Sequence, residues 1–284
     1  MNLLELGQEF KQNGYAIARA LFSAAEAAFY RDHYMALRQA GGYAGDLVNQ
    51  WDDGARDPLQ RYPRMFNMHH WDEVSRQWLL DERIRRCMVA MLDREPYAIQ
   101  TMLYFKPPGA RGQALHQDQY YLRARPGTSI AAWMALDPID EANGCLQMAP
   151  GTQELPLICP VEADENASFT TIAVPLPPGL QPLPMILEPG DVLFFNGQII
   201  HGSFPNTTRD RFRRTLVGHY IEGHAQQVAA FDHPVLRMDG AEVTEMGRSP
   251  DGGECGVWVD RDGQHLVDIN QLYTTAGALE TLPL

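Results

Sequence analysis

Apolar residues recur at helical spacing in the first third of the chain, between charged and small polar residues. A period of three to four residues is typical of amphipathic helices that pack one face on a core. Ser23 is followed three residues later by Glu26, a capping-box signature which predicts that a helix begins at Ala24. The pattern predicts helices over residues 3–12, 24–39, 72–80 and 82–92, a strand over residues 15–19, and a polar loop over residues 41–62.

From about Tyr97 the pattern changes to short apolar runs separated by turn residues, such as Pro107-Pro108-Gly109. Many short strands spaced by turns are typical of a β-sandwich or a barrel. The expected strands cover residues 100–106, 113–122, 129–136, 145–149, 170–174, 184–187, 192–195, 199–203 and 214–220.

A turn-rich tail follows from about residue 223, and its residues 257–267 predict a hairpin with a glycine in the turn. The chain shows no internal repeat and no clear linker. We therefore expect one domain over residues 1–284, with a helical part to about residue 95 and a β core over about residues 97–222. The expected fold class is mainly β with flanking helices.

Composition and charge narrow the class of partner. The chain has 284 residues, of which 45% are hydrophobic and 21% charged, as in soluble globular proteins. A formal net charge of −13 argues against a nucleic acid or an anionic membrane surface as partner and favours a neutral or cationic small molecule. No stretch approaches the roughly 18 apolar residues of a membrane helix. The composition says nothing about the oligomeric state.

The first twelve residues and the cysteines bear on the compartment. Residues 1–12 lack a basic region followed by an apolar run, so we expect no ordinary signal peptide and a cytoplasmic protein. Cys87, Cys145, Cys159 and Cys255 are scattered without C-x-x-C spacing, which disfavours a zinc cluster or a redox pair. We expect four free, mostly buried thiols in a reducing cytosol.

His116-Gln117-Asp118 is the first candidate for chemistry, together with His201 further along the chain. On an extended strand, residues i and i+2 point to the same face, so His116 and Asp118 would present their side chains together while Gln117 faces the opposite side. Two imidazoles and one carboxylate are the protein ligands of an octahedral Fe(II) site with open positions for a co-substrate and O₂. A lone His-x-Asp, or a lone histidine at a strand end, is common in proteins without a metal.

Arg213 follows His201 at a distance of twelve residues and makes the joint pattern more specific. A guanidinium stays charged and can hold the far carboxylate of a dicarboxylic acid with two parallel hydrogen bonds. Arg214 is the nearest rival for this role, but on a strand its side chain would face the other way.

The residues around these positions resemble the phytanoyl-CoA dioxygenase family of Fe(II)/2-oxoglutarate enzymes, in order from about residue 10 to residue 222. The similar segments are a strand that ends in Lys106-Pro107-Pro108, the metal motif at residues 115–121, a strand with Trp133, the turn at residues 142–152, residues 190–196 before His201-Gly202-Ser203, and Phe212-Arg213. The resemblance implies a double-stranded β-helix core, also called a jelly roll or cupin-like fold.

By this resemblance, His116, Asp118 and His201 are the iron ligands and the catalytic centre. Arg213 and Ser203 would hold the far carboxylate of 2-oxoglutarate. Met102 and Trp133 would line the co-substrate pocket, although simple core packing explains both residues equally well.

Two features depart from the family pattern. An upstream lysine that contacts 2-oxoglutarate in some relatives has no counterpart here, because Lys106 is the only lysine after Lys11 and is expected to be a turn residue. The tryptophan often found just before the metal histidine is replaced by Leu115.

The resemblance implies an oxidoreductase that uses Fe(II), 2-oxoglutarate and O₂ to hydroxylate or otherwise oxidise a small molecule, with release of succinate and CO₂. Asp118 favours this outcome over halogenation, because related halogenases carry glycine or alanine at that position. The substrate class is expected to belong to secondary metabolism.

Two groups of residues are candidates for substrate contact, with surface or packing roles as the alternative. The first group follows the metal motif and comprises Gln119, Tyr121 and Arg123. The second is a predicted lid loop that contains Asn49, Trp51, Asp52 and Arg64.

Two other functional classes remain open from the sequence. A cupin-like metal-dependent isomerase would use the same ligands without 2-oxoglutarate, and Arg213 and Ser203 count against it. A non-catalytic small-molecule-binding protein is disfavoured by the intact set of metal ligands.

Overall fold

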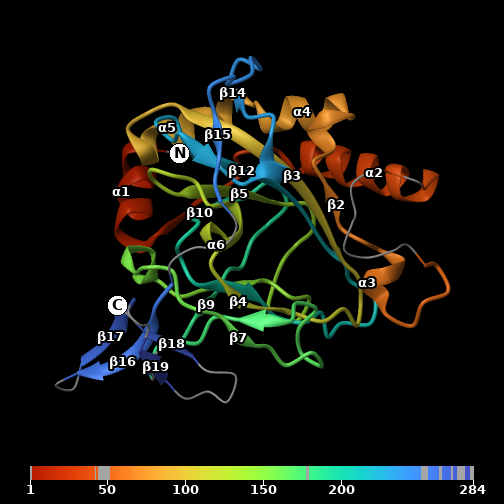
Figure 1. The fold of residues 1–284 in the computed structure, drawn as a ribbon. Coiled ribbons are helices and arrows are strands. Elements are labelled where there is room, and N and C mark those ends of the chain that lie inside the picture. Colours follow the sequence, from red (N-terminus) through yellow and green to blue (C-terminus); the bar gives the residue numbers. More distant parts are fainter. Residues whose placement is uncertain are drawn as a thin grey trace.

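Two antiparallel β-sheets form the centre of the protein, and one hydrophobic core lies between them (Figure 1). The computed structural model describes residues 2–41, 43, 52–176, 179–250, 255–261, 264–269, 271–273 and 279–281, with the backbone only in the last two ranges. The larger sheet has the order β1 (Tyr15–Ala18), β10 (Val192–Asn196), β5 (Ser129–Ala135), β12 (Arg213–Glu222), β3 (Pro96–Lys106) and β14 (Leu236–Arg237), and β2 (Met65–Phe66) also pairs with β3. The smaller sheet has the order β4 (Gln113–His116), β11 (His201–Ser203), β6 (Leu146–Met148) and β9 (Leu183–Pro184).

The chain crosses between the two sheets again and again. Strands β3, β5, β10 and β12 belong to the larger sheet, and β4, β6, β9 and β11 belong to the smaller one. This alternation, with antiparallel pairing within each sheet, is the winding of a double-stranded β-helix. The predicted fold class is confirmed.

Side chains of the larger sheet alternate between its two faces, as the period of two requires. On β5, Trp133 faces the core between the sheets and Met134 faces the opposite core. On β12, Val217 and Leu216 divide in the same way. The larger sheet is therefore buried on both faces.

Helices cover the outer face of the larger sheet (Figure 1). Four of them, α1 (Leu3–Asn13), α2 (Ala24–Ala40), α4 (Glu73–Leu79) and α5 (Glu82–Leu92), contribute apolar side chains to a second core on this face, which includes the fully buried Trp78. The predicted capping box is present, because Glu26 N donates to Ser23 Oγ at 3.2 Å and Ser23 N donates to the Glu26 carboxylate at 2.8 Å. In the described part of the chain, no helix is long and apolar enough to cross a bilayer.

Short elements complete the chain. They are α3 (Pro58–Arg61), η1 (Met68–His70), α6 (Gln119–Leu122), η2 (Thr152–Glu154), β7 (Val161–Glu162), β8 (Ile172–Ala173), β13 (Gln227–Val228), η3 (Ala230–Asp232), β15 (Gly247–Arg248), β16 (Val257–Arg261), β17 (Gln264–Asp268), β18 (Gln271–Tyr273) and β19 (Leu279–Thr281). Strands β16 and β17 pair as predicted, and the glycine of their turn lies outside the described residues.

The expectation of four free thiols is wrong for two of them. Cys159 and Cys255 form a disulfide across 96 residues, beside the short β-bridge between Ile158 and Gly256. Nothing in the local sequence signals this pair, since the two residues meet only when the tail returns to the β core. The thiol argument for a reducing compartment therefore fails, and only Cys87 and Cys145 are free and buried.

Thiol titration tests the disulfide. We expect two reactive thiols in the unfolded, unreduced protein, from Cys87 and Cys145, and four after reduction. In the control variant Cys159→Ser, the count should be the same before and after reduction, because Cys255 has lost its partner. Four thiols in the unreduced wild-type protein would contradict the pairing.

Candidate active site

Three metal-ligating side chains converge at one end of the smaller sheet. His116 and His201 face each other across the pairing of β4 with β11, and Asp118 follows β4 by two residues. The potential ligand atoms of the three side chains all lie within 4.8 Å of one another. His116 Nε2 lies 3.3 Å from Asp118 Oδ1, and His201 Nε2 lies 3.7 Å from Asp118 Oδ2.

The route by which Asp118 reaches the site differs from the prediction of a strand over residues 113–122. Strand β4 ends at His116, and Asp118 has helical backbone angles (φ −60°, ψ −34°) at the start of α6. The chain turns because Gln119 N donates to Gly197 O at 2.8 Å, which docks the start of α6 on the loop before β11. Gln117 does face away from the site, where its amide bonds Gln198 O and Ile158 N.

Hydrogen bonds to the backbone fix how both histidines point. His116 Nδ1 donates to Ala114 O at 2.9 Å, and His201 Nδ1 donates to Ile199 O at 3.1 Å. A carbonyl can only accept, so the proton of each neutral ring is on Nδ1 and the lone pair of Nε2 faces the cluster. Such bonds to the remote nitrogen are typical of metal-ligating histidines.

The protonation of the cluster suits a cation. Burial by itself would raise the pKa of Asp118, but the neighbouring imidazoles of His201, His116 and His219 hold that pKa well below its usual range. Burial, with His116 nearby, lowers the pKa of His201 to about 4. Asp118 is therefore ionised and His201 neutral near neutral pH, the forms that bind a metal. The donor set of two imidazole nitrogens and one carboxylate oxygen fits ferrous iron.

His219 belongs to the site, although we did not predict it. Its Nε2 lies 3.3 Å from Asp118 Oδ2, so the ring donates to the carboxylate oxygen that His116 does not contact. On β12, His219 is an even number of residues from Arg213, Thr215 and Val217, so its side chain lies on the same face of the strand as theirs. This alternation along the strand could have identified His219 from the sequence. His219 therefore orients the carboxylate of Asp118 through this hydrogen bond and is not itself one of the three metal ligands.

Arg213 is buried in the wall of the same cavity with no anionic partner. Its Nε donates to Gly144 O at 3.0 Å, its Nη1 donates to Thr215 Oγ1 at 3.2 Å, and its guanidinium lies 5.2 Å from the ring centre of Trp133. Burial lowers the pKa of Arg213 to about 10, so it remains charged at neutral pH. Among the described residues, no carboxylate lies within ion-pair distance of it. A buried cation of this kind is costly unless a ligand supplies the anion.

The rival Arg214 is excluded by its contacts. It faces the opposite side of β12, as its parity predicts, and its Nε and Nη2 donate to the Asp137 carboxylate at 2.8 and 2.6 Å. Its charge is therefore already paired.

The prediction that Lys106 is a turn residue is wrong. Lys106 is the last residue of β3, is 2% exposed, and donates from Nζ to Ser203 Oγ at 2.8 Å and to Phe204 O. Burial and the neighbouring Arg213 lower its pKa well below the usual value. Ser203 Oγ also accepts from Gln113 N at 3.1 Å. Lys106 and Ser203 are not among the residues that line the cavity, and Ser203 contacts Lys106, the partner of Arg213 in the sheet register.

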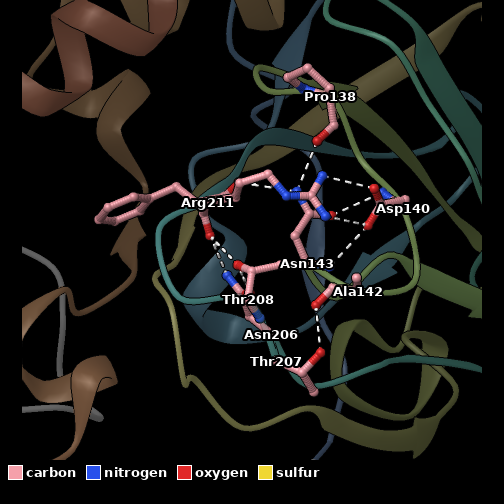
Figure 2. Close-up of polar contacts among 9 residues, drawn as sticks. Pro138, Asp140, Ala142, Asn143, Asn206, Thr207, Thr208 and Arg211 are labelled. Carbon is pink, nitrogen blue, oxygen red and sulfur yellow. Dashed lines mark hydrogen bonds and ion pairs between the residues drawn. The ribbon is translucent and has the colours of Figure 1, made fainter.

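A network of turn residues connects the β5–β6 turn to the loop that leads into β12 (Figure 2). Buried Asn143 accepts from Asp140 N at 2.9 Å and donates to Pro138 O at 2.8 Å and Phe212 O at 3.2 Å. Asn206 donates to Arg211 O at 2.7 Å from the other side of the loop. Asn143 thus ties the β5–β6 turn, which carries Gly144, to Phe212, and Asn206 holds the loop that leads into β12.

A cavity of about 350 Å³ joins these groups. Its polar lining comprises His116, Asp118, His201, His219, Gln100, Gln113, Thr170, Arg64 and Arg213. Its aromatic lining comprises Phe66, Tyr104, Tyr121, Trp133, Phe195 and Phe231. Met102 and Trp133 line the cavity and also belong to the core between the sheets. Both explanations offered for them, a place in the pocket wall and packing in the core, therefore apply.

Three residues after the metal motif were predicted to contact the substrate. Tyr121 lines the cavity, but Gln119 and Arg123 do not. Residues i and i+2 of a helix point in nearly opposite directions, so the strand argument fails once α6 begins. The Gln119 amide instead bonds Ala124 O and Ser129 N.

The predicted lid loop is only partly described. Asn49 and Trp51 lie outside the described residues, Asp52 bonds Gly54 N within its own turn, and Arg64 lines the cavity.

Comparison with known proteins identifies sequence relatives. The family model for phytanoyl-CoA dioxygenase (PhyH) matches residues 10–215. Peroxisomal phytanoyl-CoA dioxygenase of Bos taurus is 34% identical over 140 residues, which cover 46% of this chain and 41% of that protein. The Mus musculus protein is 28% identical over 241 residues, 79% of this chain and 70% of the relative. The chain spans about half the length, or less, of the first relatives it matches.

Solved structures share the fold. The epimerase SnoN, in complex with Fe³⁺, alpha ketoglutarate and nogalamycin RO, superposes with a TM-score of 0.61 at 17% identity and covers 93% of this chain and 98% of its own. EvdO2 from Micromonospora carbonacea superposes with a TM-score of 0.60 at 22% identity, covering 77% and 90%. At such identities the likeness concerns the fold alone.

The role of His219 can be measured by metal binding. We expect His219→Ala to weaken Co(II) or Fe(II) binding by about 10- to 100-fold, because Asp118 loses the donor that orients it. Anaerobic titration without co-substrate gives the dissociation constants. The control His224→Ala removes a half-exposed histidine that contacts Glu222 outside the site, and should bind metal like the wild type. Equal affinities for all three proteins would contradict the assignment.

The turn network predicts a loss of stability. Asn143→Ala should lower the free energy of unfolding by about 1–3 kcal/mol, because it removes the hydrogen bonds that a fully buried amide makes to Asp140 N, Pro138 O and Phe212 O. Denaturant unfolding measures the change. Thr207→Val, which removes a hydrogen bond to Ala142 O at the exposed edge of the same network, should cost less than about 0.5 kcal/mol. Equal losses would show that burial of Asn143 does not matter.

Proposed function

Because the chain belongs to the phytanoyl-CoA dioxygenase family, we propose that it is an Fe(II)- and 2-oxoglutarate-dependent dioxygenase that hydroxylates or otherwise oxidises a small molecule. One observation carries the proposal: the three metal ligands line one cavity with buried Arg213, which has no carboxylate partner among the described residues. A metal centre at one end and an unmatched cation at the other suit a dicarboxylate that spans the two.

Different residues of the chain would bind the metal and the far carboxylate of the co-substrate. His116, Asp118 and His201 would hold ferrous iron, which when bound supplies the centre where 2-oxoglutarate and O₂ react to give succinate and CO₂. Arg213 would pair with the far carboxylate, and its bonds to Gly144 and Thr215 hold the guanidinium in place. The aromatic walls exclude water from the reacting atoms.

The two competing functions fit this cavity less well. A cupin-like isomerase has no use for a buried guanidinium that lacks a carboxylate, and a non-catalytic binding protein has no use for the intact set of metal ligands. The intact carboxylate of Asp118 supports oxidation over halogenation, since it occupies the position where a halide would need an opening. Of the structural relatives, SnoN is described as an epimerase from nogalamycin biosynthesis, which supports a role in secondary metabolism.

Co-substrate binding tests the proposal directly. Anaerobic addition of Fe(II) and 2-oxoglutarate should produce the weak visible charge-transfer band of a bidentate 2-oxo acid complex in the wild-type protein. Arg213→Lys should raise the dissociation constant for 2-oxoglutarate by at least about 10-fold, because an ammonium loses the two-pronged contact. Its affinity for the metal alone should not change, since Arg213 contacts none of the three ligands.

Arg214→Lys is the matched control, one residue along the strand and facing away from the cavity. It should bind 2-oxoglutarate like the wild type. No band in the wild-type protein, or equal effects of the two substitutions, would refute the proposed function.

A further inference from the structure

A second arginine lines the cavity without an anionic partner. Arg64 precedes β2, and the register of Met65 with Leu103 sets it opposite Tyr104 on β3. Among the described residues, no carboxylate lies within ion-pair distance of Arg64, and its Nε is buried with no hydrogen-bond partner. Its guanidinium makes one polar contact with the described residues, in which Nη1 donates to Tyr104 Oη at 3.3 Å.

Three aromatic rings hold the Arg64 guanidinium in place. Its Cζ lies 4.9 Å from the ring centre of Phe66, 5.1 Å from that of Phe169 and 5.3 Å from that of Tyr104. Rings attract a cation through their faces and shield it from water, but they do not neutralise its charge. The side chain is thus ordered in advance and still lacks a counter-ion, which is how an anion-binding residue is built.

Co-substrate binding would not satisfy Arg64. The charges of ferrous iron and Arg213 are balanced by those of Asp118 and the two carboxylates of 2-oxoglutarate. Lys106 does not line the cavity and already donates to Ser203 Oγ and Phe204 O. Arg64 therefore remains the unbalanced charge among the described lining residues once the co-substrate is in place.

The rest of the cavity limits the size and polarity of the substrate. A volume of about 350 Å³ lies at the small end of the range of roughly 300–1,000 Å³ for ligand sites, and 2-oxoglutarate takes part of it. The surface is mostly apolar and aromatic, with Tyr121 and Phe231 among the lining residues. Burial raises the pKa of Tyr121 to about 12, so that side chain offers a hydroxyl rather than a competing anion.

We propose that the primary substrate is a small organic acid with an apolar body, whose carboxylate pairs with the Arg64 guanidinium while a carbon of the body faces the metal centre. The inference rests on the proposed function and names the substrate class for it. The overall charge of −13 suggested a neutral or cationic substrate, but distant surface charges are screened, and the cavity presents an arginine.

The experiment compares acids with their uncharged analogues. The probes are hexanoate, 3-phenylpropanoate and cinnamate, each beside its primary amide, added anaerobically to wild-type protein loaded with Fe(II) and 2-oxoglutarate. Binding is followed by the perturbation of the charge-transfer band, and O₂ uptake with succinate release is measured separately. We expect at least one acid to bind about 10- to 100-fold more tightly than its amide, as for a charge-assisted pair in a water-poor site.

Variants assign the preference to Arg64. Arg64→Gln should abolish the preference for acid over amide, and Arg64→Lys should keep part of it, because the charge remains and the fork is lost. Both should bind 2-oxoglutarate with the wild-type dissociation constant, which also shows that they fold. The control Arg237→Gln removes an exposed arginine with a closely similar contact, 3.4 Å to Tyr97 Oη and 5.4 Å to its ring centre, and should keep the full preference.

Each other outcome overturns the inference and leaves the proposed function standing. Amides that bind as well as acids, no response to any acid, or an unchanged preference in Arg64→Gln would remove Arg64 from substrate recognition. Weaker binding of 2-oxoglutarate to Arg64→Gln would assign the residue to the co-substrate instead. In this experiment, the absence of the charge-transfer band in wild type is the outcome that counts against the dioxygenase itself.

Discussion

The antiparallel pairing of β4 with β11 is the constraint on which the site depends, because it sets His116 directly opposite His201. The two residues are far apart in the chain, and no local structure would bring them together. Once the strands are paired, a bond from each Nδ1 to a carbonyl turns the lone pair of Nε2 inward. The larger sheet supports this pairing through the core between the sheets, and the helices pack against the outer face of that sheet.

The second feature on which the site depends is that several of its charged side chains lack a partner of opposite charge among the described residues. Asp118 is surrounded by three imidazoles, whereas Arg213 and Arg64 line the cavity without a carboxylate among the described residues. Burying charges in this way costs stability unless a metal ion and anionic ligands complete the set. The cavity is thus arranged for its ligands. The turn network around Asn143 holds Phe212, which precedes Arg213 (Figure 2), and Gly144 O and Thr215 Oγ1 accept hydrogen bonds from Arg213 itself.

Much of the fold was predictable, because periodicity reflects burial of one face. Strands β1, β3, β5, β10 and β12 of the larger sheet and the long helices follow the apolar pattern, whereas the two-residue strands β2 and β14 were not predicted. The error at residues 117–122 arose where Gly197 O accepts from Gln119 N and turns the chain into α6. That contact comes from a distant loop, and it also separates Tyr121, which lines the cavity, from Gln119, which does not. Lys106 was misjudged for a related reason, since its partners Ser203 and Phe204 lie on another strand and its loop.

By itself, the sequence determined the fold class, the three metal ligands as candidates and Arg213 over Arg214, because spacing and strand parity are local properties. Tertiary structure alone decided which charges remain without a partner. It paired Arg214 with Asp137, left Arg213 and Arg64 facing the cavity, joined Cys159 to Cys255, and placed His219 on Asp118. The physical reason is that a charge is satisfied by whatever lies within a few ångströms of it, and those neighbours come from strands and loops far apart in the chain.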